Sequence, residues 1–150
     1  MKGFTLVELI VVFSVIGILT SLGLASYSSY NGKQTVQSAA TDVVTMLNTA
    51  KSQSLSQVIP SSCASNPVTG YQVDVTVGSQ QYTLSAICGT KQVITTSNLP
   101  AKVTFDNGST TTVFYPIATG TIANASSISI TGYGITKIIS ISQAGTVSVN

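Results

Sequence analysis

The sequence contains no histidine, no tryptophan and no arginine. Without histidine it lacks the side chain most used for proton transfer at neutral pH, which is also the commonest metal ligand. Without arginine it lacks the planar group that contacts phosphate through two hydrogen bonds, and its six lysines are scattered along the chain. These absences argue against a nucleic-acid-binding protein and leave an enzyme few groups to use.

Acidic residues are also scarce, since the chain has only Glu8, Asp42, Asp74 and Asp106. Asp74 lies in a predicted strand and Asp106 in a predicted turn, where an aspartate commonly caps its own backbone. Neither has the poised base or nucleophile beside it that acid–base catalysis needs. We therefore expect no catalytic residue, no cofactor and no enzyme activity.

One long apolar block runs from Phe4 to Leu24, whereas the rest is rich in serine, threonine, asparagine and glutamine. As a helix the block would be about 31 Å long, which matches the roughly 30 Å hydrocarbon core of a bilayer. The pattern predicts a membrane-spanning helix followed by a polar head. A secretory signal peptide cut after Ala25 is the alternative, because Gly23-Leu24-Ala25 could serve as a small-residue cleavage sequence.

Glu8 is the only glutamate in the chain, and it lies inside the apolar block. A charged residue at mid-bilayer costs about 2.5 to 3.5 kcal/mol, and less near the boundary, so such a residue usually has a partner. No lysine lies inside the block, whereas a free α-amine would supply the cation. In the alternative interpretation, Glu8 only reaches the lipid headgroups and needs no partner.

The residues Gly3-Phe4-Thr5-Leu6-Val7-Glu8 resemble the processing signal of type IV prepilins and type II secretion pseudopilins. The match combines a basic leader with Lys2, a glycine at the cut, a phenylalanine after it and one buried acid. In that family a prepilin peptidase in the membrane cuts after the glycine and N-methylates the new first residue. The resemblance implies leader cleavage between Gly3 and Phe4, and N-methylation of Phe4.

Subunit assembly through Phe4 and Glu8 is a further implication of this resemblance. In an array of parallel, staggered helices, the amine of Phe4 on one subunit can lie beside Glu8 of a neighbour. At about 4 Å and an effective dielectric near 20, the attraction is on the order of 4 kcal/mol before desolvation is subtracted. The pair would favour one register of the docked subunit over others.

A second helical pattern follows the apolar block. Apolar residues recur at three- and four-residue spacing from Val36 to Leu55, which predicts an amphipathic helix from about Gly32 to Val58. Pro60 would end it. The helix could continue the membrane helix. Many relatives carry a proline near the position of Ala25, and this proline is absent here, so we expect any kink or unwinding between Gly17 and Gly23.

Beyond Cys63 the pattern changes to the period of two that is typical of strands. The segments 71–77 and 81–87 flank a turn sequence and predict a hairpin. Further strands are expected at 102–105, 111–115, 127–131, 137–142 and 146–149, the first two separated by the tight-turn sequence Asp106-Asn107-Gly108. The fold class expected is α+β: a long N-terminal helix, half membrane and half amphipathic, packed on a C-terminal antiparallel β-sheet head.

These patterns divide the chain into a leader at 1–3, a transmembrane assembly helix at 4–25, an amphipathic helix at 26–59 and a β-rich head at 60–150. Within the head, Phe105–Gly108 and Ile139–Val149 are similar to the GspH/FimT-like minor pilins and pseudopilins. Lys2 should stay on the cytoplasmic side, which places the head outside.

The two cysteines, Cys63 and Cys88, both lie in the expected head. An oxidising compartment would pair them, and the closed loop of about 25 residues would stabilise the fold by roughly 3 kcal/mol. The alternative is a pair of buried free thiols. Two cysteines without histidine are too few for a structural zinc site, so no metal is expected.

Together these features predict a structural subunit of a type IV pilus-like filament, a minor pilin or pseudopilin. The implied partners are other pilin subunits, the prepilin peptidase, an inner-membrane assembly platform and membrane lipid, with no specific nucleic acid. A single-pass membrane precursor would become part of an extracellular or periplasmic filament. Two alternatives are a membrane-tethered binding module that does not polymerise and a soluble β-domain released by signal peptidase.

Overall fold

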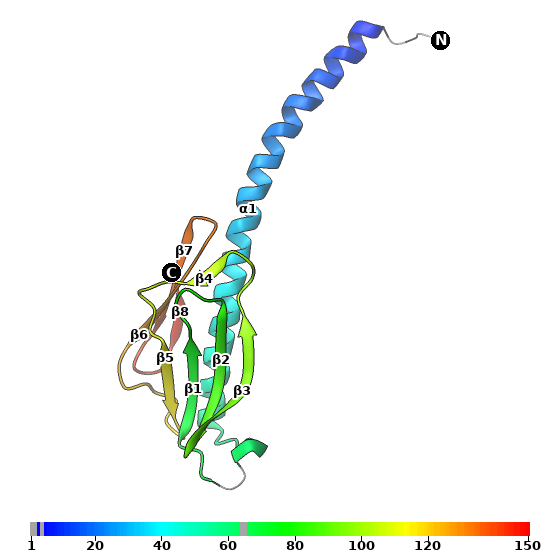
Figure 1. The fold of residues 1–150 in the computed structure, drawn as a ribbon. Helices are drawn as coiled ribbons and strands as arrows, with labels where there is room; N and C mark the ends of the chain where they lie inside the picture. Colours follow the sequence, from blue (N-terminus) through cyan, green and yellow to red (C-terminus); the bar gives the residue numbers. More distant parts are fainter. Residues whose placement is uncertain (1–2, 4, 64–65) are drawn as a thin grey trace.

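A computed structural model describes residues 3, 5–63 and 66–150, and it leaves the side chains of residues 21–26 undescribed. A long helix leads into a head of antiparallel strands (Figure 1), which confirms the α+β class. The elements are α1 (Leu6–Leu55), a short 3-10 helix η1 (Ser61–Cys63), β1 (Gly70–Val75), β2 (Gln81–Cys88), β3 (Thr90–Asn98), β4 (Val103–Phe105), β5 (Thr112–Pro116), β6 (Ser126–Gly132), β7 (Ile135–Ile141) and β8 (Val147–Val149).

The helix α1 contains 50 residues in one continuous run, about 75 Å at 1.5 Å per residue. It curves without a break (Figure 1), so the segment between Gly17 and Gly23 is helical rather than unwound. The helix ends at Leu55, three residues before the expected Val58. The reason is local, because Gln57 has a φ of 51°, in the left-handed region that a right-handed helix cannot continue.

The strands form two four-stranded antiparallel sheets, in the orders β3-β2-β1-β5 and β4-β6-β7-β8, where the sequence pattern indicated one. The expected hairpin of β1 and β2 is confirmed, with Val75 paired to Tyr82. The Asp106-Asn107-Gly108 turn does not join a hairpin, because β4 pairs with β6 and β5 pairs with β1. Backbone bonds from Asp106 N to Ser129 O and from Thr110 N to Ser127 O hold this turn against β6.

The lower half of α1 supplies the centre of the core between the helix and both sheets. A stripe of its side chains is fully buried, and all of them except Ala39 were expected from the three- and four-residue spacing: Val36, Ala39, Ala40, Val43, Leu47 and Ala50. Burying a valine or leucine contributes about 1.5 to 3 kcal/mol each. Leu55 was expected in this stripe but is 49% exposed, because it is the last residue of the helix.

Two contacts orient the head along α1. Near the middle of α1, Gly32 leaves room for the turn between β6 and β7, since a Cβ on this glycine would lie 3.0 Å from the Cβ of Tyr133. Near the lower end, Lys51 Nζ donates to the backbone oxygens of Ala144 and Gly145, both at 3.1 Å. The helix is therefore fixed against the second sheet at two separate heights.

A disulfide joins Cys63 and Cys88, as expected, with their Cα atoms 5.8 Å apart. Cys63 lies in η1 and Cys88 ends β2, so the bond ties the chain that follows α1 to the first sheet. Both side chains are buried.

Replacing both cysteines with serine should lower the free energy of unfolding by about 3 kcal/mol, because the unfolded chain regains the freedom of a 25-residue loop. Urea denaturation of the oxidised protein and of the Cys63→Ser/Cys88→Ser variant measures the difference. The reduced wild-type protein is the matched control and should behave like the variant. Equal stability of the oxidised protein and the variant would contradict the prediction.

Tyr115 is fully buried in β5, and its hydroxyl has no hydrogen-bond partner in the described part of the chain. Burial raises the pKa of Tyr115 from 10.0 to about 12, because the phenolate cannot be solvated there. Because the pKa is raised in the folded state, the neutral Tyr115 side chain contributes fully to the stability of the fold below pH 10. This contribution is lost as the pH rises toward 12.

Between pH 8 and pH 11 the free energy of unfolding of the wild-type protein should fall, because Tyr115 ionises more readily in the unfolded chain. In the Tyr115→Phe variant this fall should be smaller by about 1.4 kcal/mol. Its stability at pH 8 should be close to wild type, since the lost hydroxyl has no partner. Urea unfolding at both pH values measures the effect. Tyr30→Phe serves as control because Tyr30 is 67% exposed, and an equal alkaline loss in all three proteins would refute the assignment.

Candidate functional site

The start of α1 is organised by Thr5 and Glu8. Thr5 is the N-cap residue, and its Oγ1 accepts a hydrogen bond from Glu8 N at 3.3 Å. In return, Glu8 Oε2 accepts from Thr5 N and from Thr5 Oγ1, each at 3.4 Å. This reciprocal capping box satisfies two backbone donors of the first turn and places a negative charge at the positive end of the helix dipole.

The residues predicted from the sequence are placed only in part. Gly3 is exposed, and a Cβ added there would meet nothing within 4 Å. Phe4, the predicted cleavage, methylation and assembly residue, lies outside the described residues. Among the described residues, Glu8 makes its hydrogen bonds with Thr5 and forms no ion pair.

Thr5 is the residue of this site that the sequence reasoning missed. The four residues Thr5-Leu6-Val7-Glu8 match the S/T-x-x-E pattern of a capping box, so the signal was present in the sequence. The predictions for Glu8 concerned a cation or the lipid headgroups, and a hydrogen bond to Thr5 was not among them. The structure shows that the same carboxylate also has a role within its own subunit.

The upper part of α1 exposes nearly all of its apolar side chains. Leu6 is 76% exposed, Val7 70% and Phe13 64%. Such a continuous apolar surface is far larger than the patches that soluble monomers usually expose, and it calls for a covering. Within the residues whose side chains are described, no helix has a stretch that is both long and apolar enough to cross a membrane.

The environment of Glu8 on α1 is apolar. A shallow hollow of about 220 Å³ is lined by Glu8, Leu9, Val12 and Phe13. Further along, Ser14 Oγ donates to Ile10 O at 2.8 Å, so the helix itself satisfies this hydroxyl. Glu8 is the one charged residue in the described helix between Thr5 and Thr20.

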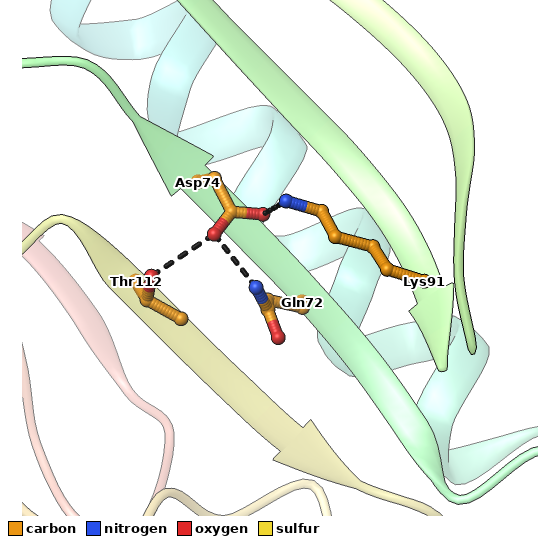
Figure 2. A network of polar contacts seen from close by, with 4 residues as sticks. All are labelled: Gln72, Asp74, Lys91 and Thr112. Atoms are coloured by element: carbon orange, nitrogen blue, oxygen red, sulfur yellow. Dashed lines mark hydrogen bonds and ion pairs between the residues drawn. The ribbon is translucent and has the colours of Figure 1, made fainter. Parts of the chain in front are cut away.

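The two acids of the head have structural contacts. The carboxylate of Asp74 accepts hydrogen bonds from Gln72 Nε2 at 2.7 Å and from Thr112 Oγ1 at 2.9 Å, and its other oxygen lies 2.9 Å from Lys91 Nζ (Figure 2). Asp106 Oδ1 accepts from Asn107 N at 2.8 Å, the local capping expected of it. Among the described residues there is no cluster of three side chains that could hold a metal ion.

Comparison with known proteins agrees with this geometry. Residues 1–24 match the family model of the prokaryotic N-terminal methylation motif. Two fimbrial proteins of Pseudomonas aeruginosa are each 32% identical over 97 residues, which is 65% of this chain and 60% of theirs. The chain thus aligns with about 60% of the length of these relatives.

The fold is similar to that of a minor pseudopilin, EpsH of the Vibrio cholerae type II secretion system. Two structures of EpsH superimpose with a TM-score of 0.56 each, at 11% and 12% identity. They cover 77% and 78% of this chain, and 95% and 94% of the EpsH chains. Three findings therefore agree: the chain carries the prokaryotic N-terminal methylation motif, it is similar in sequence to fimbrial proteins, and its fold is similar to that of a minor pseudopilin.

Proposed function

We propose that this protein is a structural subunit of a type IV pilus-like filament, in the role of a minor pilin or pseudopilin. The observation that carries the proposal is the exposed apolar surface of α1, from Leu6 to Leu19, which starts at a single carboxylate. Packing of several such helices against one another would cover this surface and leave the heads outside. The methylation motif at residues 1–24 and the pseudopilin-like head support the same role.

Maturation is the first step of the proposed function. The prepilin peptidase removes residues 1–3 and methylates the amine of Phe4, and the exposed position of Gly3 supports access to this bond. Before assembly the precursor is anchored by the apolar sequence 4–24, with Lys2 on the cytoplasmic side and the head outside. An inner-membrane platform then adds the subunit to the filament.

Docking is the second step, and Glu8 is its proposed organising group. Among the described residues this carboxylate accepts only long hydrogen bonds of 3.4 Å from Thr5, so it remains available to a stronger partner. The α-amine of Phe4 on a neighbouring subunit would be that partner. Surrounded by apolar side chains, an unpaired carboxylate is costly, so the pair selects one register of docking.

Processing can be tested by the mass of the mature protein. We expect a chain that begins at N-methyl-Phe4, and we expect Gly3→Val to leave the leader attached because a larger side chain blocks the cut. Gly17→Ala is the matched control, since a Cβ there meets nothing within 4 Å, and it should be processed normally. A mature chain that begins at Ser26, or one that retains Met1, would refute the proposed maturation.

The charge of Glu8 can be separated from its capping role by two variants. Glu8→Gln keeps a side chain that completes a capping box but removes the charge, and it should abolish filaments or reduce them strongly. Thr5→Val keeps the charge and removes the cap, at a cost of about 1 kcal/mol to the helix start, and filaments should persist.

Filament yield by electron microscopy, at equal amounts of processed protein, distinguishes the two variants. Wild-type yield from Glu8→Gln would rule out the charge pair as the organising contact. Absence of filaments from every variant and from wild type, with the head still exposed on the cell surface, would instead indicate a tethered binding module.

A further inference from the structure

The outer edge of the first sheet is unusually open. In the described sheet, β3 pairs only with β2, and with nine residues it is the longest strand. From Gln92 to Asn98 it carries no charge and no proline. Proteins usually protect such an edge with charge, proline, a bulge or a covering segment, because its free backbone groups would pair with another chain. In β3 the charge of Lys91 and a bulge at Ile94 both precede Thr95, so that Thr95 to Asn98 form a regular, uncharged edge. Figure 1 shows β3 as the outermost strand beside α1.

A bulge in β3 adds apolar surface to this edge. The pairing runs from Leu84 with Thr95 to Ser85 with Val93, so Ile94 is an additional residue on the outer strand. Val93 is 56% exposed and Ile94 37% exposed. Two neighbouring apolar side chains therefore remain accessible at the middle of the edge.

The backbone groups available for pairing can be identified from the ladder. Leu99 N donates to Gln80 O at 2.8 Å, immediately beyond the strand. In an antiparallel ladder, alternate residues bond to the partner, so the groups of Thr95 and Ser97 point toward β2. The N–H and C=O of Thr96 and Asn98 then point away from the sheet, toward solvent.

A groove of about 680 Å³ follows β3 on the side of α1. Met46, Tyr82 and Leu84 contribute apolar surface to it, and Thr49 and Thr95 line its two walls. Asp42 is the only charged residue among those that line the groove, and it contributes to the raised pKa of Tyr82 after the larger effect of burial. The groove thus combines apolar surface with one negative charge.

We propose that β3 and this groove bind an extended segment of a different protein by strand addition. The backbone of the segment pairs with Thr96 and Asn98, its alternate apolar side chains enter the groove, and a lysine or arginine lies near Asp42. Strand addition works in this way, since backbone bonds provide affinity and pockets for alternate side chains provide specificity. The inference goes beyond filament assembly and does not depend on Glu8.

An ion pair restrains the edge strand β3 before any partner binds. Lys91 on β3 reaches across the sheet to Asp74 on β1 at 2.9 Å (Figure 2), which restrains the first part of the strand. A strand that is already ordered loses less conformational freedom on binding, so less of the binding energy is lost to ordering.

A second copy of the chain fits this surface poorly. Antiparallel pairing of two β3 strands would relate the copies by a two-fold axis and turn their α1 helices in opposite directions. That arrangement conflicts with a parallel array of helices. Lys91 is the only cation on β3 and is already paired with Asp74, so a second β3 does not supply the charge that Asp42 calls for.

Hydrogen exchange of the full chain in lipid nanodiscs tests the proposal. The probe is the N-acetylated, C-amidated peptide Val-Thr-Val-Thr-Val-Thr-Lys, which places three valines and the lysine on one face. At saturation the amides of Thr96 and Asn98 should exchange about tenfold more slowly. A peptide with glutamate in place of lysine should bind about fivefold more weakly, because attraction to Asp42 becomes repulsion.

Variants at one position provide the matched control. Thr96→Pro removes an outward N–H that the ladder does not use, and it should abolish peptide binding, whereas Thr96→Val should bind like wild type. A probe N-methylated on its pairing edge makes the same test with an unchanged protein and should not bind. Glu8→Gln should leave peptide binding unchanged, so that failure of filament assembly and failure of this proposal can be distinguished.

Three results would overturn the proposal. The first is no protection of Thr96 and Asn98 at millimolar peptide, and the second is equal binding by the N-methylated probe. The third is protection of these amides without peptide that increases with protein concentration, since this would identify a second copy as the occupant.

Discussion

The packing of the lower half of α1 against both sheets is the interaction on which the rest of the structure depends. Its buried stripe alternates small residues such as Ala39 and Ala40 with the larger Val43 and Leu47. The small side chains let the sheets approach the helix closely, and the larger ones fill the space between strands. Neither sheet could bury its inner face without this helix, so the two sheets form one head around it.

At its N-terminal end, from Leu6 to Leu19, the same helix exposes its apolar side chains instead of burying them. There most of the described apolar side chains are exposed, and the hydrogen bonds described for the single acid are those of a local cap. One continuous helix therefore connects a self-sufficient core to a surface that needs other molecules. The capping box gives this surface a defined beginning, because it fixes where the helix starts and where the carboxylate lies.

Polar contacts decide how the head is placed on the helix. Lys51 binds the turn between β7 and β8, and Gly32 admits the turn between β6 and β7. Asp74 links β1, β3 and β5 on the opposite face of the first sheet (Figure 2). The chain has only six lysines and four acidic residues, so charged contacts of this kind are few.

The sequence by itself determined the features that depend on near neighbours in the chain. The spacing of apolar residues indicated the buried stripe of α1, and the two alternating segments around Gly78 indicated the first hairpin. The two cysteines permitted only one intrachain pairing, which the structure contains. The capping box also depends only on near neighbours, Thr5 and Glu8.

Only the tertiary structure decided which strands pair across long separations. Alternation shows that a strand has one buried face, but it does not identify the neighbouring strand. For this reason the division into two sheets could not be predicted, nor could the three passages of the chain between them, from β3 to β4, from β4 to β5 and from β5 to β6. Strand β3 was not predicted, because most of its residues are exposed and they do not alternate between apolar and polar. Its free edge is a property of the sheet, in which β2 lies on the other side of β3.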